Sequence, residues 1–129
     1  MRNGRRVLVV DDEPHIVRSL TILLRRKDFE PVSARNGRLA WESVLHNKPD
    51  VILLDVMMPE MDGFELCRAL KKDPRFQDIY VIMLTARGQA QDYYRGLEAG
   101  ANEYLTKPFS PSQLLHRLET ILAERSNNE

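Results

Sequence analysis

Five residues in the sequence carry side chains that could act together on an anion: Asp11, Asp12, Asp55, Thr85 and Lys107. They supply three carboxylates, one hydroxyl and one ammonium, which leaves a formal charge of about −2. If the acids converge, each close pair costs about 4 kcal/mol at an effective dielectric constant of about 20. A divalent cation would remove this repulsion, and a few hard oxygen ligands favour Mg²⁺ over zinc or calcium. The residue types therefore predict a Mg²⁺ site.

A carboxylate beside Mg²⁺ could also accept a phosphoryl group as an acyl phosphate. The metal and Lys107 would neutralise the transferring oxygens, and Thr85 could donate a hydrogen bond to one of them. Each residue also has a plainer explanation, because Asp11 and Asp12 could favour the start of a helix and Asp55 could open a turn. The chemistry depends on whether the fold brings all five residues together.

Each of these residues lies at the end of a short apolar run, which is typical of a strand buried on both faces. We expect strands over residues 5–10, 29–34, 51–54, 79–84 and 101–106. Pro31 makes the second an edge strand, because proline cannot donate to a ladder. Apolar residues at helical spacing follow Pro14, Asn36, Asp62 and Ser110 and precede Ala99. Asn36 and Ser110 are expected N-caps and Gly100 a C-cap.

Strands that alternate with helices predict an α/β fold. We expect a five-stranded parallel sheet, order 2-1-3-4-5, with five helices on both faces, a flavodoxin-like (βα)5 arrangement. Ligands in such sheets bind beyond the carboxyl ends of the strands, where the strand order reverses. The first and third strands would then be neighbours, so Asp11, Asp12 and Asp55 should converge.

Length and composition indicate one compact domain. The chain has 129 residues, of which 43% are hydrophobic, enough for a single core. Its 19 basic and 19 acidic residues balance, which removes bulk charge as a reason to bind nucleic acid or a membrane. The one cysteine, Cys67, excludes an intrachain disulfide. The sequence lacks a long apolar run or a signal-peptide pattern, so we expect a cytoplasmic protein.

Four motifs resemble the receiver domain of two-component response regulators, over nearly the whole chain from Val7 to about Leu122. They are Val9-Val10-Asp11-Asp12-Glu13, Leu54-Asp55-Val56-Met57-Met58-Pro59-Glu60-Met61-Asp62-Gly63, Met83-Leu84-Thr85-Ala86 and Leu105-Thr106-Lys107-Pro108-Phe109. The resemblance implies that residues 1–124 form the receiver domain, that residues 125–129 are a polar tail and that there is no output domain.

The resemblance also assigns roles to single residues. It implies that Asp55 is the phosphoacceptor and that Asp12 binds Mg²⁺ directly, with Asp11 acting through water. Asp55 and the main-chain carbonyl of Met57 would complete the metal ligands. Thr85 and Lys107 would sense the phosphoryl group, and these two with Asp55 would be the catalytic set.

By the same resemblance the chain is a phosphoacceptor switch, and not a conventional enzyme, although it assists its own phosphorylation and dephosphorylation. A histidine kinase or a histidine phosphotransfer protein would donate the phosphoryl group. Thr85 would move toward it and Tyr104 would rotate into the vacated space, changing the face around Tyr93, Tyr94 and Tyr104. That face, formed by the helix before Gly100, the fifth strand and the last helix, would control a partner or a fused output domain.

A dimer through this face is left open by the sequence. Regulators that dimerise there usually follow Gly-Ala with two acids, whereas Gly100-Ala101-Asn102-Glu103 has one. The family also commonly has proline at the position of Tyr80, where the fourth strand begins.

Three other functions are compatible with an α/β fold of this size. Aspartate-nucleophile phosphatases of the haloacid dehalogenase type need a second Asp two residues after the nucleophile, where this chain has Met57. A flavin mononucleotide binder would need a phosphate-binding loop after the first strand, where Asp11-Asp12-Glu13 would repel phosphate. A phosphorylation-independent docking module, a pseudo-receiver, stays open as the alternative, although such domains usually lose an acid or the lysine that this chain keeps.

Overall fold

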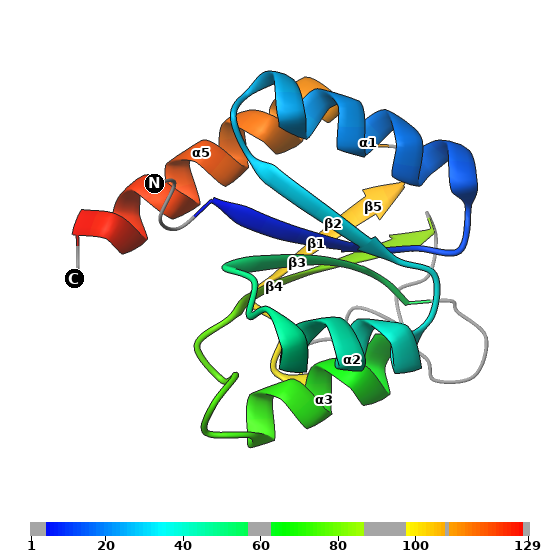
Figure 1. Cartoon of the computed structure of the whole chain (residues 1–129), viewed down its shortest axis with the longest axis vertical. Coiled ribbons are helices and arrows are strands. Elements are labelled where there is room, and N and C mark those ends of the chain that lie inside the picture. The colour runs from blue at the N-terminus through cyan, green and yellow to red at the C-terminus, as the bar shows by residue number, and fades with distance from the viewer. Residues whose placement is uncertain (1–4, 57–62, 87–97, 108, 128–129) are drawn as a thin grey trace.

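Five parallel strands form one sheet in the order β2-β1-β3-β4-β5, as predicted (Figure 1). The computed structural model describes residues 5–56, 63–86, 98–107 and 109–127. The strands are β1 Arg6–Val10, β2 Glu30–Ala34, β3 Val51–Asp55, β4 Tyr80–Ala86 and β5 Glu103–Lys107. All four neighbouring pairs are parallel. Pro31 lies on β2, which is an edge strand, as its missing N–H requires.

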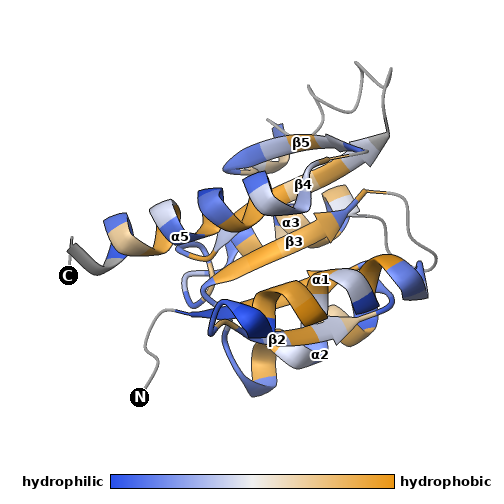
Figure 2. Ribbon diagram, turned by 90° about the horizontal axis from the view of Figure 1, so that it is seen from above, coloured by the Kyte–Doolittle hydropathy of each residue, from blue (hydrophilic) through white to orange (hydrophobic). Residues whose placement is uncertain are grey.

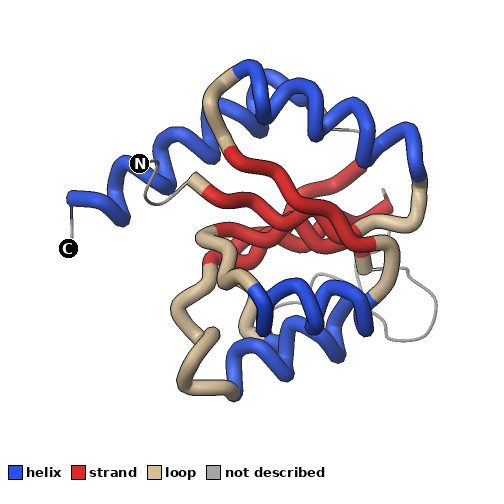
Figure 3. The backbone as a smooth tube through the Cα atoms, in the orientation of Figure 1, coloured by secondary structure: helices blue, strands red, loops and turns tan. Residues whose placement is uncertain are grey.

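Helices cover both faces of the sheet (Figure 3). They are α1 Pro14–Arg26, α2 Gly37–His46, α3 Gly63–Lys72 and α5 Pro111–Asn127. Helices α1 and α5 lie on one face and α2 and α3 on the other (Figure 1). Glu98 and Ala99 are helical, but the rest of the expected helix before Gly100 lies outside the described residues. The predicted α/β class is confirmed.

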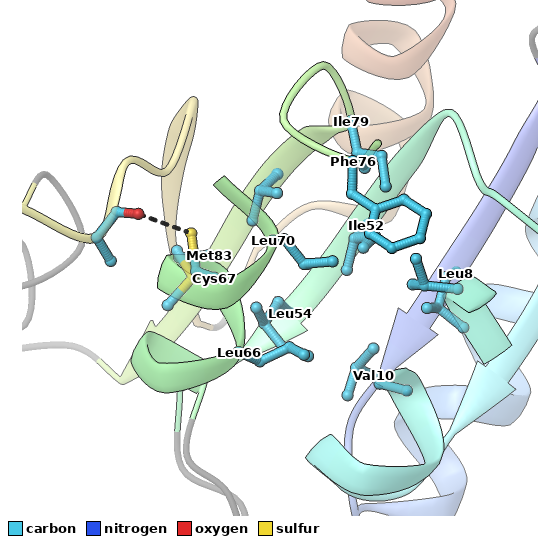
Figure 4. Packing of buried hydrophobic residues seen from close by; sticks show 14 of the residues in the cluster. Leu8, Val10, Ile52, Leu54, Leu66, Cys67, Leu70, Phe76, Ile79 and Met83 are labelled. Carbon is cyan, nitrogen blue, oxygen red and sulfur yellow. Dashed lines mark hydrogen bonds between the residues drawn. The ribbon is translucent and has the colours of Figure 1, made fainter. Parts of the chain in front are cut away.

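The sheet separates two apolar clusters, because side chains alternate along each strand. Val7 and Val9 pack on the side of α1 and α5, whereas Leu8 and Val10 pack on the side of α2 and α3. Figure 4 shows part of the cluster on the side of α2 and α3. Strand β3 is buried at every residue and is hydrophobic along most of its length (Figure 2). Its continuous apolar pattern follows from this burial on both faces.

Predicted caps fix the helix ends. The Oδ1 atom of Asn36 accepts a hydrogen bond of 2.8 Å from the Leu39 amide at the start of α2. Ser110 Oγ accepts one of 3.3 Å from the Gln113 amide at the start of α5. Gly100 has φ +92°, the left-handed conformation expected of a glycine C-cap.

The ends of three strands and of α5 differ from the sequence-based expectation. Strands β3, β4 and β5 each continue through residues placed just beyond them, because the parallel ladder extends to the pairs Asp55 with Leu84 and Ala86 with Lys107. Helix α5 continues through Asn127, and within it Arg125 donates a hydrogen bond to the Asp78 carbonyl. Strand β1 begins and α5 ends at the side of the sheet opposite the carboxyl ends of the strands (Figure 1).

Candidate acidic site at the carboxyl ends of the strands

Three aspartates meet where β1 and β3 end, as the strand order predicted. Asp55 is the last residue of β3, and Asp11 directly follows β1, where its amide bonds the Ala34 carbonyl at 3.1 Å. One carboxylate oxygen from each of Asp11, Asp12 and Asp55 lies within 4.8 Å of the other two. Convergence of the acids is therefore a feature of the fold.

Burial differs sharply among these acids. Asp11 is 1% exposed and Asp55 is 6% exposed, whereas Asp12 is exposed. Asp11 Oδ1 accepts a hydrogen bond of 3.0 Å from the Glu13 amide, which fixes the orientation of that carboxylate. Asp11 and Asp55 thus form the buried part of the site, and Asp12 lies at its solvent-exposed side. Hard, crowded oxygen donors with one side open to water suit Mg²⁺, which keeps several waters when it binds protein.

Lys107, the last residue of β5, brings its ammonium into this acidic group. Its Nζ lies 3.0 Å from Asp11 Oδ2, and 3.7 Å from both Asp55 Oδ1 and Glu13 Oε1. Burial acts to lower the pKa of Lys107, but the hydrogen bond to Asp11 and the charges of Asp55, Asp11 and Glu13 outweigh it and raise that pKa. The ammonium is therefore held charged beside the acids.

Thr85 and Tyr104 share one face of the sheet. Thr85 is 2% exposed and lies on β4, one residue beyond Leu84, the partner of Asp55. Tyr104 lies on β5, pairs with Met83 and packs against the cluster on the side of α2 and α3. Because side chains alternate, Thr85 faces the same side as Met83. The Thr85 hydroxyl and the Tyr104 ring therefore lie on the same face of the sheet.

Some predicted site residues lie outside the part of the chain that the structure describes, namely Met57, Tyr93 and Tyr94. One contact was missed from the sequence: Glu13 reaches Lys107, although it was given no role there. Its only signal was its place directly after Asp11 and Asp12, which equally suits an exposed residue at a helix start.

A sequence model of the response regulator receiver domain matches residues 7–119. The phosphate regulon transcriptional regulatory protein PhoB of Pseudomonas aeruginosa is 44% identical over 119 residues, 92% of this chain and 52% of that protein. The DNA-binding response regulator MtrA of Mycolicibacterium smegmatis is 40% identical over 118 residues, 92% of this chain and 50% of that protein. The chain thus spans about half the length of these curated relatives.

Solved structures show the same fold. A putative response regulator from Chloroflexus aurantiacus superposes with a TM-score of 0.86 at 37% identity, covering 92% of this chain and 98% of that one. A CheY-like response regulator receiver domain protein from Methanospirillum hungatei gives a TM-score of 0.89 at 26% identity, covering 97% of this chain and 98% of that one.

Within the described ranges, every helix is too short or too polar to cross a membrane.

Proposed function

The chain belongs to the response regulator receiver domain family, and from that premise we propose that it is a phosphoacceptor switch with Asp55 as the acceptor. Receiver domains are signalling domains and not conventional enzymes. One observation carries the proposal: the Asp55 carboxylate lies at the end of β3 among two further carboxylates, with the Lys107 ammonium 3.7 Å away. Three separate chain segments supply these groups, which ordinary helix caps would not require.

The acidic group fits Mg²⁺. Asp12 would bind the ion directly and Asp11 through water, with Asp55 and the Met57 carbonyl as further ligands. When bound, Mg²⁺ would neutralise charge on the transferring phosphoryl oxygens. Mutual repulsion of the three carboxylates supports this assignment, since a divalent cation would cancel the excess negative charge that Lys107 leaves.

The transfer itself needs only positioning and charge. A carboxylate oxygen of Asp55 attacks the phosphorus of a phosphohistidine on the donor, and an O–P bond forms while the P–N bond breaks. The electron pair of the broken bond stays on the imidazole nitrogen. Lys107 then pairs with one transferred oxygen, and the Thr85 hydroxyl donates a hydrogen bond to another. Dephosphorylation is a separate hydrolysis: water attacks the phosphorus, the bond from phosphorus to the Asp55 oxygen breaks, and the carboxylate is restored as phosphate and a proton leave.

Phosphorylation would switch a second surface of the domain. It adds about one negative charge at Asp55, by analogy with other phosphorylated residues. Thr85 would move toward that charge, and Tyr104 would fill the space that it leaves, since both lie on the same side of the sheet. The exposed side of β5 and α5 would carry the change to a downstream protein or a fused output domain.

Asn102 stands where regulators that dimerise through this surface usually have a second acid. The Oδ1 atom of Asn102 accepts hydrogen bonds from the Val81 amide at 2.9 Å and from Lys71 Nζ at 2.8 Å. Its side-chain oxygen is therefore occupied by hydrogen bonds within the domain. Glu103 forms an ion pair with Arg117 of α5.

This chain has an apolar surface beside the acidic site, on which a phosphodonor protein could dock. A pocket of about 380 Å³ opens next to Lys107, lined by His15, Ile16, Ser19, Leu20, Lys107, Phe109 and Pro111. A histidine kinase or histidine phosphotransfer protein, acting in the cytoplasm, would place its phosphohistidine over Asp55 while it covers this pocket. Contact there would exclude water from the transfer.

Intact mass tests the proposal. The wild type and Asp55→Asn are incubated with Mg²⁺ and acetyl phosphate, with and without a chelator. We expect one phosphoryl group on the wild type alone, and none once the metal is chelated. No gain under any condition would reject the phosphoacceptor and favour the pseudo-receiver, a docking module that works without phosphorylation.

A further inference from the structure

The Lys107 ammonium faces three carboxylates, and only one of them makes a full hydrogen bond. Asp11 Oδ2 lies at 3.0 Å, whereas Asp55 Oδ1 and Glu13 Oε1 both lie at 3.7 Å. Charged N–H to carboxylate bonds are about 2.7–2.9 Å long. Lys107 is thus anchored on Asp11 and stands equally far from the phosphoacceptor and from Glu13.

Glu13 is well placed to hold the ammonium back. Its backbone is fixed, because its amide donates to Asp11 Oδ1 and its carbonyl accepts from the Val17 amide in the first turn of α1. Its side chain is 49% exposed, compared with 8% for Asp55. The other oxygen of Glu13 lies 3.6 Å from Nε2 of His15. Glu13 therefore reaches Lys107 from the solvent side, while Asp55 reaches it from the interior.

We propose that Glu13 is a positioning residue that shares Lys107 with Asp55 and so slows phosphoryl uptake. The inference rests on the proposed function, in which Lys107 must close on the phosphoryl group at Asp55. A normal charged hydrogen bond to Asp55 Oδ1 would require the ammonium, which lies 3.7 Å away, to move by nearly 1 Å toward the interior. The attraction of Glu13 opposes that movement. Among the residues that the structure describes, the acids within metal-binding reach are Asp11, Asp12 and Asp55, so Glu13 acts through Lys107 and not as one of these three.

The test compares the rate of phosphorylation of the wild type with that of Glu13→Gln, which keeps the shape and removes the charge. Acetyl phosphate is the donor, Mg²⁺ is saturating, and intact mass gives the rate. We expect Glu13→Gln to be about two- to fivefold faster, the range that a half-exposed ion pair allows. Glu124→Gln is the control, because it removes an equal charge from the far part of α5, where the side chain is exposed. Its rate should match the wild type.

A general loss of repulsion between the protein and the anionic donor could also raise the rate, so position is measured directly. Crystal structures of the wild type and Glu13→Gln should show Lys107 Nζ moving from 3.7 Å to about 3 Å from Asp55 Oδ1 in the variant. A faster variant with the ammonium displaced in this way supports the inference. An unchanged rate, or an ammonium that stays in place, overturns it while the wild type still gains its phosphoryl group. A wild type that gains none overturns the proposed function as well.

Discussion

Gly63, the first residue of α3, brings that helix against the main chain of Asp55. A Cβ atom at this position would lie 2.5 Å from the Asp55 carbonyl oxygen and 2.9 Å from the Val56 Cα. Both neighbours are backbone atoms, which cannot turn aside as a flexible side chain would. We therefore predict that Gly63→Ala destabilises the domain, even though alanine is favoured over glycine in helices by about 0.5–1 kcal/mol.

The magnitude follows from these opposing effects. Forcing a methyl group into a packed region costs about 1–3 kcal/mol, and contact with backbone puts this site at the upper end. After the helix preference is subtracted, we expect a net loss of about 2 kcal/mol in the free energy of unfolding. For 129 residues this lowers Tm by about 7 °C. Since the displaced carbonyl belongs to Asp55, phosphorylation by acetyl phosphate should also slow by roughly tenfold.

Gly100→Ala is the matched control for this prediction. Its Cβ would meet Lys71 Cγ at 3.1 Å, a flexible side chain, and the cost comes from its φ of +92°. We expect it to lose about 1–2 kcal/mol as well, but to keep the wild-type rate of phosphorylation. Thermal unfolding and intact mass on both variants separate general instability from displacement of Asp55. A Gly63→Ala protein as stable as the wild type would refute the packing argument.

Two further predictions concern stability away from the site. Asn36→Ala removes the cap on the Leu39 amide and should lose about 1 kcal/mol in urea denaturation, and an unchanged midpoint would show that α2 does not depend on this cap. The hydrogen bond from Lys48, 2.8 Å away, is the main reason that the pKa of Asp78 lies below its usual 3.8. That stabilisation is present near neutral pH and is lost as the pH falls below 3.8, so wild type should lose more stability than Asp78→Asn between about pH 6 and about pH 3. Equal losses in the two proteins would contradict this assignment.

The strand order and the meeting of the three aspartates could be predicted because both follow from local patterns and one general rule. Continuous apolar runs mark strands buried on two faces, and the ends of parallel strands share one edge. The exact residue at which each strand ends could not be predicted. Asp55 and Lys107 belong to the strands, because hydrogen bonds from neighbouring strands extend the ladder past the last apolar residue.

Side-chain contacts between segments that are distant in the sequence could not be predicted from it. The three acceptors of Lys71 Nζ are the carbonyls of Gln77 and Ile79 and the side chain of Asn102, groups that come together only after β4 and β5 pair. Burial lowers the pKa of Lys71. Asn102 looked like a missing interface charge in the sequence, whereas in the structure it is part of this internal contact. Glu13 likewise gains a partner only when β5 is placed beside β1 and β3.

The uninterrupted course of α5 has a consequence for how the two ends of the molecule communicate. The helix starts at Pro111, four residues after Lys107, and continues for 17 residues to Asn127 at the far end of the sheet. Its length is about 25 Å at 1.5 Å per residue. Because α5 is one helix packed along the sheet, with Leu118 in the buried cluster and Arg125 bonded to the Asp78 carbonyl, a shift near Lys107 would move the helix as a single rigid rod. A protein segment joined after this helix could therefore respond to events at Asp55 without approaching the acidic site.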